Sequence, residues 1–192
     1  MRDVALLGAR LVVGGYLAVH GAQKLFGAFG GSGLHKTGAG FERIGLSPGK
    51  PMATLAGATE LGGGLLTAAG VADPAGPLAI MGVMSVAATT HRANGPLNAN
   101  RGFELPLTNL AAAAALAVAG PGRLRIGPGL PRRLTVLGAL AGGVMSAVSL
   151  TKMLSAPAAP AAQPAAQPGP AAPVTPSSPS SENGQRRESA AT

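Results

Sequence analysis

Six side chains that can act as acids, bases or hydrogen-bonding groups lie within or beside long apolar runs of this sequence. They are His20, Gln23, Lys24, Glu60, His91 and Glu104. A charge near the centre of a bilayer costs about 2.5–3.5 kcal/mol on insertion scales, so such groups usually turn inward and pair. Imidazole and carboxyl groups can hydrogen-bond to carbonyl oxygens and exchange protons. We therefore treat these six residues as the candidate polar pocket.

Two of the apolar runs carry the most informative polar groups. His20, Gln23 and Lys24 share one helical face, because residues three and four apart are neighbours on a helix. Lys24 alone would be explained by snorkelling to a membrane interface. Glu60 lies near the middle of its run on a face of small residues, which predicts close contact with another helix. Glu60 is either a structural carboxyl, protonated or paired with Arg10, or a proton-handling or ligand-binding group.

The same residues include side chains that can ligate a metal or a cofactor. Two histidines can ligate haem iron, and zinc or manganese needs three or four convergent ligands. Because the sequence does not fix their spacing, we predict no metal site and disfavour haem, and quinone remains the candidate cofactor. The chain has no cysteine, which excludes disulfides, thiolate-ligated iron–sulfur clusters and thiol redox chemistry. Redox chemistry would need a bound cofactor or a partner.

The overall composition is that of a membrane protein. Hydrophobic residues make up 46% of the chain and charged residues 11%, whereas soluble domains carry about 25% charge. The 30 glycines allow helix backbones to approach closely in lipid. The net charge of +8 suits cations that face anionic lipid head groups. Nucleic-acid binding is disfavoured because the cations are scattered and aromatic residues are scarce.

Apolar runs that predict spanning helices lie at 4–26, 51–71, 78–90 and 103–119. The first is long enough to cross a hydrocarbon core of about 30 Å. It could instead be a signal peptide, but Arg10 interrupts it. We predict an all-α membrane protein with a four-helix transmembrane bundle, and 134–150 is a candidate fifth span at the short limit.

Three parts follow from these runs: the bundle at 1–126, a basic loop with the candidate fifth span at 127–154, and a Pro/Ala/Ser-rich tail at 155–192. The tail has too few apolar side chains to offset the entropy of ordering, so we expect it to be disordered. Around 41–46 we expect either a short amphipathic piece on the membrane surface or a solvated loop. Basic residues are nearly balanced between the two predicted sides, so charge alone leaves the orientation open.

Several motifs occur in an order that resembles the DoxX family of bacterial membrane proteins, a group that includes membrane subunits of thiosulfate:quinone oxidoreductases. The most specific are HGAQKLFG at 20–27 and ELGGGLL at 60–66. The resemblance covers about residues 4–126. The other matching positions are Arg10-Leu11, 40–46, His91, 102–107 and 120–124.

The resemblance implies a multi-pass bundle in the bacterial plasma membrane. It also implies a subunit of a quinone-linked redox or oxidative-stress complex, with a peripheral redox protein as partner. It transfers no catalytic role to any residue, and it leaves open whether the chain is itself catalytic or forms a homo-oligomer. The alternatives from the residues are a membrane scaffold that anchors soluble partners and a small transporter for an anionic or lipid substrate.

Overall fold

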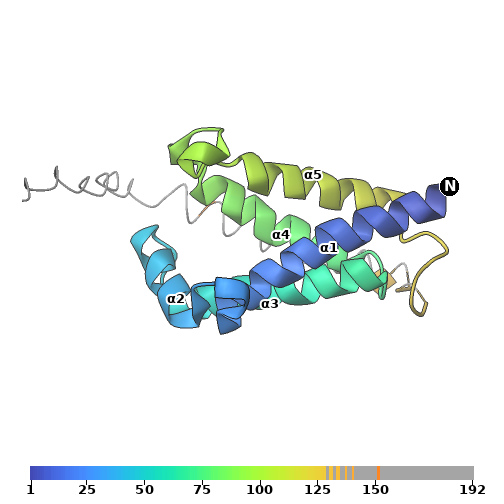
Figure 1. Ribbon diagram of the computed structural model, residues 1–192, viewed down its shortest axis with the longest axis horizontal. Helices are drawn as coiled ribbons and strands as arrows, with labels where there is room; N and C mark the ends of the chain where they lie inside the picture. The colour runs from blue at the N-terminus through green and yellow to red at the C-terminus, as the bar shows by residue number, and fades with distance from the viewer. Residues whose placement is uncertain (129, 132, 135–136, 138–139, 141–150, 152–192) are drawn as a thin grey trace, which may run out of the picture. The chain divides into compact units, whose positions relative to one another are not determined.

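Every regular element in the described part of the chain is a helix, which confirms the all-α prediction. The computed structural model describes residues 1–128, 130–131, 133–134, 137, 140 and 151, all within one compact unit, Met1–Ala159. The elements are α1 Arg2–Phe26, η1 Ala28–Gly30, α2 Gly33–Arg43, α3 Gly49–Ala69, α4 Ala75–Thr90, η2 Arg92–Asn94, η3 Asn98–Asn100 and α5 Glu104–Ala119 (Figure 1). The predicted tail at 155–192 and nearly all of the candidate span at 134–150 lie outside the described residues.

Helices α1 and α3 form the tightest pair, and they run antiparallel. Gly14 of α1 lies against Gly64 of α3, and Gly21 lies against Gly57. A methyl group added at Gly64 would fall 2.5 Å from the Gly14 carbonyl oxygen, which is too close for any Cβ atom. The small-residue face of the second apolar run therefore does make the close helix contact that the sequence predicts.

Helix α4 packs between α3 and α5 and completes the core. Leu17 of α1, Ile80 and Met84 of α4 and Ala113 of α5 form one buried hydrophobic cluster. On the α3 side, Gly76 of α4 lies close to the backbone and hydroxyl of Thr67. The four long helices thus meet around one core, and they coincide with the four predicted apolar runs to within a few residues.

The outer faces of the long helices are apolar. Val12 of α1 is 71% exposed, Leu65 of α3 is 57% exposed and Val118 of α5 is 91% exposed. Within the described residues, α1 is the one helix both long and apolar enough to cross a membrane, with a mean hydropathy of 1.5. Only 28% of that stretch is buried, unlike the core helix of a soluble protein. Helices α4 and α5 are apolar but shorter.

Two glutamates organise the connections at one end of the bundle. Glu42, at the end of α2, accepts a hydrogen bond from the Gly49 backbone N–H at 3.1 Å and so caps the start of α3. Glu104, at the start of α5, accepts one from the Asn98 N–H at 2.8 Å. Helix α2 and the α4–α5 connection lie at the same end, opposite the N-terminus (Figure 1).

Candidate functional site

A cavity of about 460 Å³ opens at the end of the bundle that carries α2 and the α4–α5 connection. Its walls come from α1, the end of α2 and the segment after it, α3, α4, the α4–α5 connection and the start of α5. Most of its lining is apolar, as ligand sites usually are. Four of the six predicted pocket residues contribute to it, namely His20, Lys24, Glu60 and His91.

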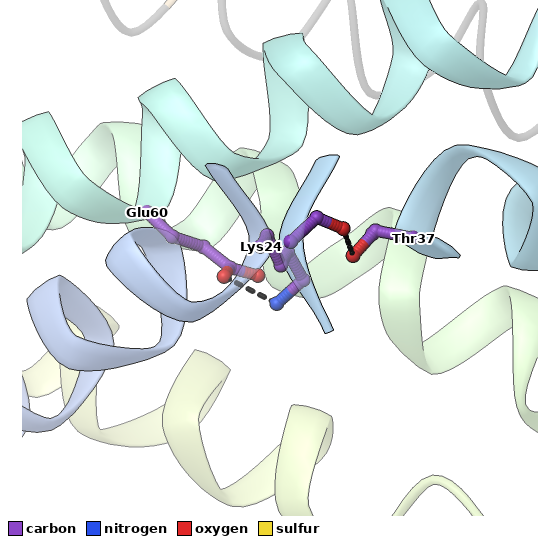
Figure 2. Close-up of polar contacts among 4 residues, drawn as sticks. Lys24, Thr37 and Glu60 are labelled. Carbon is purple, nitrogen blue, oxygen red and sulfur yellow. Dashed lines mark hydrogen bonds and ion pairs between the residues drawn. The ribbon is translucent and has the colours of Figure 1, made fainter. Parts of the chain in front are cut away.

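An ion pair lies on the cavity wall between α1 and α3. The Lys24 ammonium nitrogen is 2.5 Å from a Glu60 carboxylate oxygen (Figure 2). The Glu60 side chain is 4% exposed and that of Lys24 23%, so the carboxylate is buried and its neutralising cation reaches the cavity. Gly57, one turn before Glu60, lets the last turn of α1 approach α3 closely enough for this contact. Thr37 of α2 does not join the pair, because its hydroxyl donates to the Gly33 carbonyl.

Arg10, the possible partner that the sequence offered for Glu60, does not pair with it, because Glu60 is paired with Lys24. Arg10 is 2% exposed and donates from Nη2 to the Leu124 carbonyl at 2.6 Å, and from Nη1 to the Pro121 carbonyl. Arg10 and Lys24 are separated by 14 residues of α1, or about 21 Å along a helix. Because α3 runs antiparallel, its middle faces Lys24, and Arg10 lies near Gly70 at the other end. Arg10 therefore anchors the segment after α5.

The two cavity histidines are held in different ways. His91 Nδ1 lies 2.8 Å from the Ala87 carbonyl oxygen. The Thr90 hydroxyl also lies 3.1 Å from Nδ1. In the neutral tautomer that donates from Nδ1 to the Ala87 carbonyl, Nε2 is an acceptor. His20 stacks on Tyr16, with ring centroids 4.4 Å apart and an interplanar angle of 48°. The hydrogen bond of His91 and the aromatic contact of His20 therefore orient the two imidazole rings that line the cavity.

Gln23 and Glu104 lie outside the lining of this cavity. Gln23 packs against Gly31 in the turn after η1, where an added methyl group would meet its Cβ at 2.5 Å. Glu104 is occupied by the Asn98 N–H. The structure therefore brings four of the six residues to one cavity, and the other two lie at connections near it.

Sequence reasoning missed much of the cavity wall. Phe41, Ile44 and Leu46 were predicted to lie on the membrane surface or in a loop, and they line the cavity. Arg101 and Asn98 also line it, although a loop arginine and a loop asparagine carry no signal in the sequence. The spacing of Phe41 and Ile44 gave the only hint, since it predicts an apolar face.

The polar groups on the wall mostly donate hydrogen bonds. Lys24, Arg101, Asn98 and Asn109 can each donate, whereas the carboxylate of Glu60 is already bonded to Lys24. No group of three His, Cys, Asp or Glu residues in the described ranges is placed to hold a metal ion. The arrangement suits an apolar ligand that presents carbonyl or anionic oxygens.

Part of the chain matches a model of a known protein family. Residues 5–93 match the DoxX model. This part of the chain belongs to the DoxX family. The DoxX region runs from α1 through α4, includes both specific motifs and carries His20, Lys24, Glu60 and His91; the motif at 102–107 lies beyond it. DoxX proteins are membrane-associated, in agreement with the apolar, exposed α1. No curated protein and no solved structure matches the chain.

Proposed function

We propose that this DoxX protein is a quinone-binding membrane subunit of a redox complex, in which a partner protein supplies the electrons. The observation that supports it best is the cavity of about 460 Å³, where apolar walls surround the Lys24–Glu60 ion pair and His91. A quinone is a flat apolar ring with two carbonyl oxygens. Such a ligand needs an apolar cavity with a few well-placed donors.

The chain's own residues support binding and proton exchange. Lys24 and Arg101 can donate to a quinone carbonyl, and apolar residues such as Leu17 and Met84 can contact the ring. Reduction of a quinone to a hydroquinone takes up two electrons and two protons, and imidazole and carboxyl groups can exchange those protons. The sequence has no cysteine, so a partner must carry any thiolate-ligated electron donor.

The membrane placement belongs to the same proposal. Helices α1, α3, α4 and α5 would each cross the bacterial plasma membrane, since their outer faces are apolar and α1 and α3 meet through glycines. We expect the protein to stay in the membrane fraction after an alkaline carbonate wash and to need detergent for extraction. Release into the aqueous phase by the wash would contradict this placement.

Tyr16 provides a direct test of quinone binding. The chain has one tyrosine and no tryptophan, and Tyr16 lines the cavity, so intrinsic fluorescence reports on the site. In dodecyl maltoside micelles, a decyl-substituted benzoquinone should quench this fluorescence saturably. Removal of one hydrogen bond to the ligand, by Lys24→Met or Arg101→Met, should weaken the apparent affinity about tenfold, because about 1.4 kcal/mol corresponds to a factor of ten.

The matched control is Arg92→Met. Arg92 is exposed in the same α4–α5 connection as Arg101 and is not part of the cavity lining, so this variant should quench like the parent protein. Quenching that rises linearly without saturation, or that is equal in the Arg101→Met and Arg92→Met variants, would contradict quinone binding in this cavity.

A further inference from the structure

Five basic side chains surround the cavity end of the bundle. Lys36 and Arg43 lie on α2, Lys50 in the first turn of α3, and Arg92 and Arg101 in the α4–α5 connection. All five are exposed. In the part of the chain that the structure describes, none of these side chains forms an ion pair or a hydrogen bond. We refer to these five residues as the basic collar.

The acidic residues beside the collar do not neutralise it. Glu42 and Glu104 accept hydrogen bonds from the backbone N–H groups of Gly49 and Asn98. Neither forms an ion pair within the described residues. Even with both carboxylates counted, the five cations leave an excess of three positive charges. A field of this sign attracts anions.

Exposed apolar side chains accompany the collar. Phe26 is 72% exposed, Phe29 79%, Ile44 44% and Leu97 58%. Phe26 and Phe29 flank the end of α1, Ile44 follows α2, and Leu97 lies in the α4–α5 connection. Cations interleaved with exposed apolar groups are typical of surfaces at the lipid head-group boundary. This combination favours a bilayer surface over an acidic soluble protein.

Two basic residues at the opposite end donate to backbone carbonyls. Arg2 donates to the Ala119 carbonyl at 3.2 Å, and Arg10 is buried on the carbonyls of Pro121 and Leu124. In the described part of the segment after α5, Arg123, Arg125 and Arg133 remain exposed. Among the described residues, that end therefore presents three exposed cations besides the bonded Arg2, against five in the collar.

We propose that the basic collar binds the phosphate head groups of anionic phospholipids and places the cavity end at the anionic, cytoplasmic leaflet. Each Lys or Arg near such a surface contributes attraction, and loops rich in Lys and Arg remain on the cytoplasmic side. This inference uses the membrane placement proposed above but does not depend on quinone binding.

Lipid retention tests the proposal directly. The full-length protein would be equilibrated in detergent with equal amounts of phosphatidylglycerol and phosphatidylcholine, and its bound lipids counted by native mass spectrometry. We expect several-fold more phosphatidylglycerol than phosphatidylcholine on the parent protein. A variant with all five collar residues changed to Gln should lose that preference. The matched control, Arg123→Gln with Arg133→Gln, removes exposed charges outside the collar and should keep it.

Two results would overturn the lipid assignment. One is an unchanged preference for phosphatidylglycerol in the collar variant, which would leave an acidic protein as the partner for the collar. The other is an equal loss of that preference in the Arg123→Gln/Arg133→Gln control. Neither readout involves quinone, so a failure of quinone binding would leave both unaffected. Normal expression and a normal melting temperature of the collar variant would show that it folds.

The absence of cysteine allows the orientation to be measured in the same protein. Ala93→Cys lies in the exposed α4–α5 connection, and Pro128→Cys lies in the exposed segment beyond α5. In spheroplasts, a membrane-impermeant maleimide should label Pro128→Cys at once and Ala93→Cys only after the membrane is opened. The reverse labelling pattern would overturn the cytoplasmic placement of the collar.

Discussion

The ammonium group of Lys24 and the carboxylate of Glu60 neutralise each other at 2.5 Å, across the interface between α1 and α3. The contact joins the last turn of one helix to the middle of the other. It depends on the glycine contacts that bring the two backbones together. The Lys24–Glu60 pair therefore joins α1 to α3 and also forms part of the cavity wall.

Removal of both partners together should cost less than the two single removals added together. Lys24→Met would leave the Glu60 carboxylate, which is 4% exposed, without its cation. We expect a loss of about 1–3 kcal/mol, below the value for fully buried pairs because Lys24 is 23% exposed. The double variant Lys24→Met/Glu60→Met should lose less than the sum of the single variants. Unfolding in detergent measures this cycle, and strict additivity would argue against the pair.

The glycine contacts between α1 and α3 give a second prediction. A methyl group at Gly14 would lie 2.5 Å from the Gly64 carbonyl oxygen, whereas one at Gly15 would meet nothing within 4 Å. Gly14→Ala should therefore destabilise the bundle by about 1–3 kcal/mol through overpacking. Gly15→Ala should be neutral or slightly stabilising, since alanine favours helix. Melting temperatures in detergent compare the two, and equal shifts would contradict the described packing.

Arg10 should control the order of the segment that follows α5. Its guanidinium holds the carbonyls of Pro121 and Leu124, and the Ile126 N–H donates to the Ala69 carbonyl at 3.0 Å in the same region. Arg10→Met should speed hydrogen exchange at Ile126. The control Arg123→Gln alters an exposed side chain of that segment and should leave exchange unchanged. Equal protection in the two variants would show that Arg10 is not the anchor.

Asp73, in the turn between α3 and α4, gives a pH prediction. Burial raises the pKa of Asp73 above its ordinary value of 3.8, although Arg10 and Arg125 oppose the shift. The pKa of Asp73 is higher in the folded protein than in the unfolded chain. The contribution of protonated Asp73 to folding stability is therefore complete below pH 3.8 and is lost as the pH rises through the folded-state pKa. Relative to Asp73→Asn, the parent protein should therefore lose stability as the pH rises from below 3.8 through the raised pKa of Asp73. Melting curves across that range test it, and a constant difference would contradict the shift.

The sequence was informative wherever one local signal controlled the structure. The four apolar runs became four helices because apolar length and glycine spacing do not depend on distant contacts. The Lys24–Glu60 partnership was not predicted, because Arg10 and Lys24 both lie on the broad polar sector of α1. Only the antiparallel register with α3 decides which of them faces Glu60.

The cavity was predictable in part for a similar reason. Alternating helix directions bring His20, Glu60 and His91 toward one end, whatever the details of packing. Gln23 and Glu104 do not line the cavity, because both contact loop backbone. The path of a loop cannot be predicted from helical periodicity. The contribution of Phe41 to the wall depends on how α2 folds back over α3.

In the proposed membrane placement, the unequal lengths of the helices determine how the surrounding lipid must adapt. Helix α1 has 25 residues, or about 37 Å, whereas α4 and α5 have 16 each, or about 24 Å. A hydrocarbon layer about 30 Å thick matches neither value. The bilayer would become thinner beside α4 and α5, and α1 would have to tilt. Each ångström of hydrophobic mismatch carries a modest energetic cost. Acyl chain length would then set how readily this protein clusters with its neighbours.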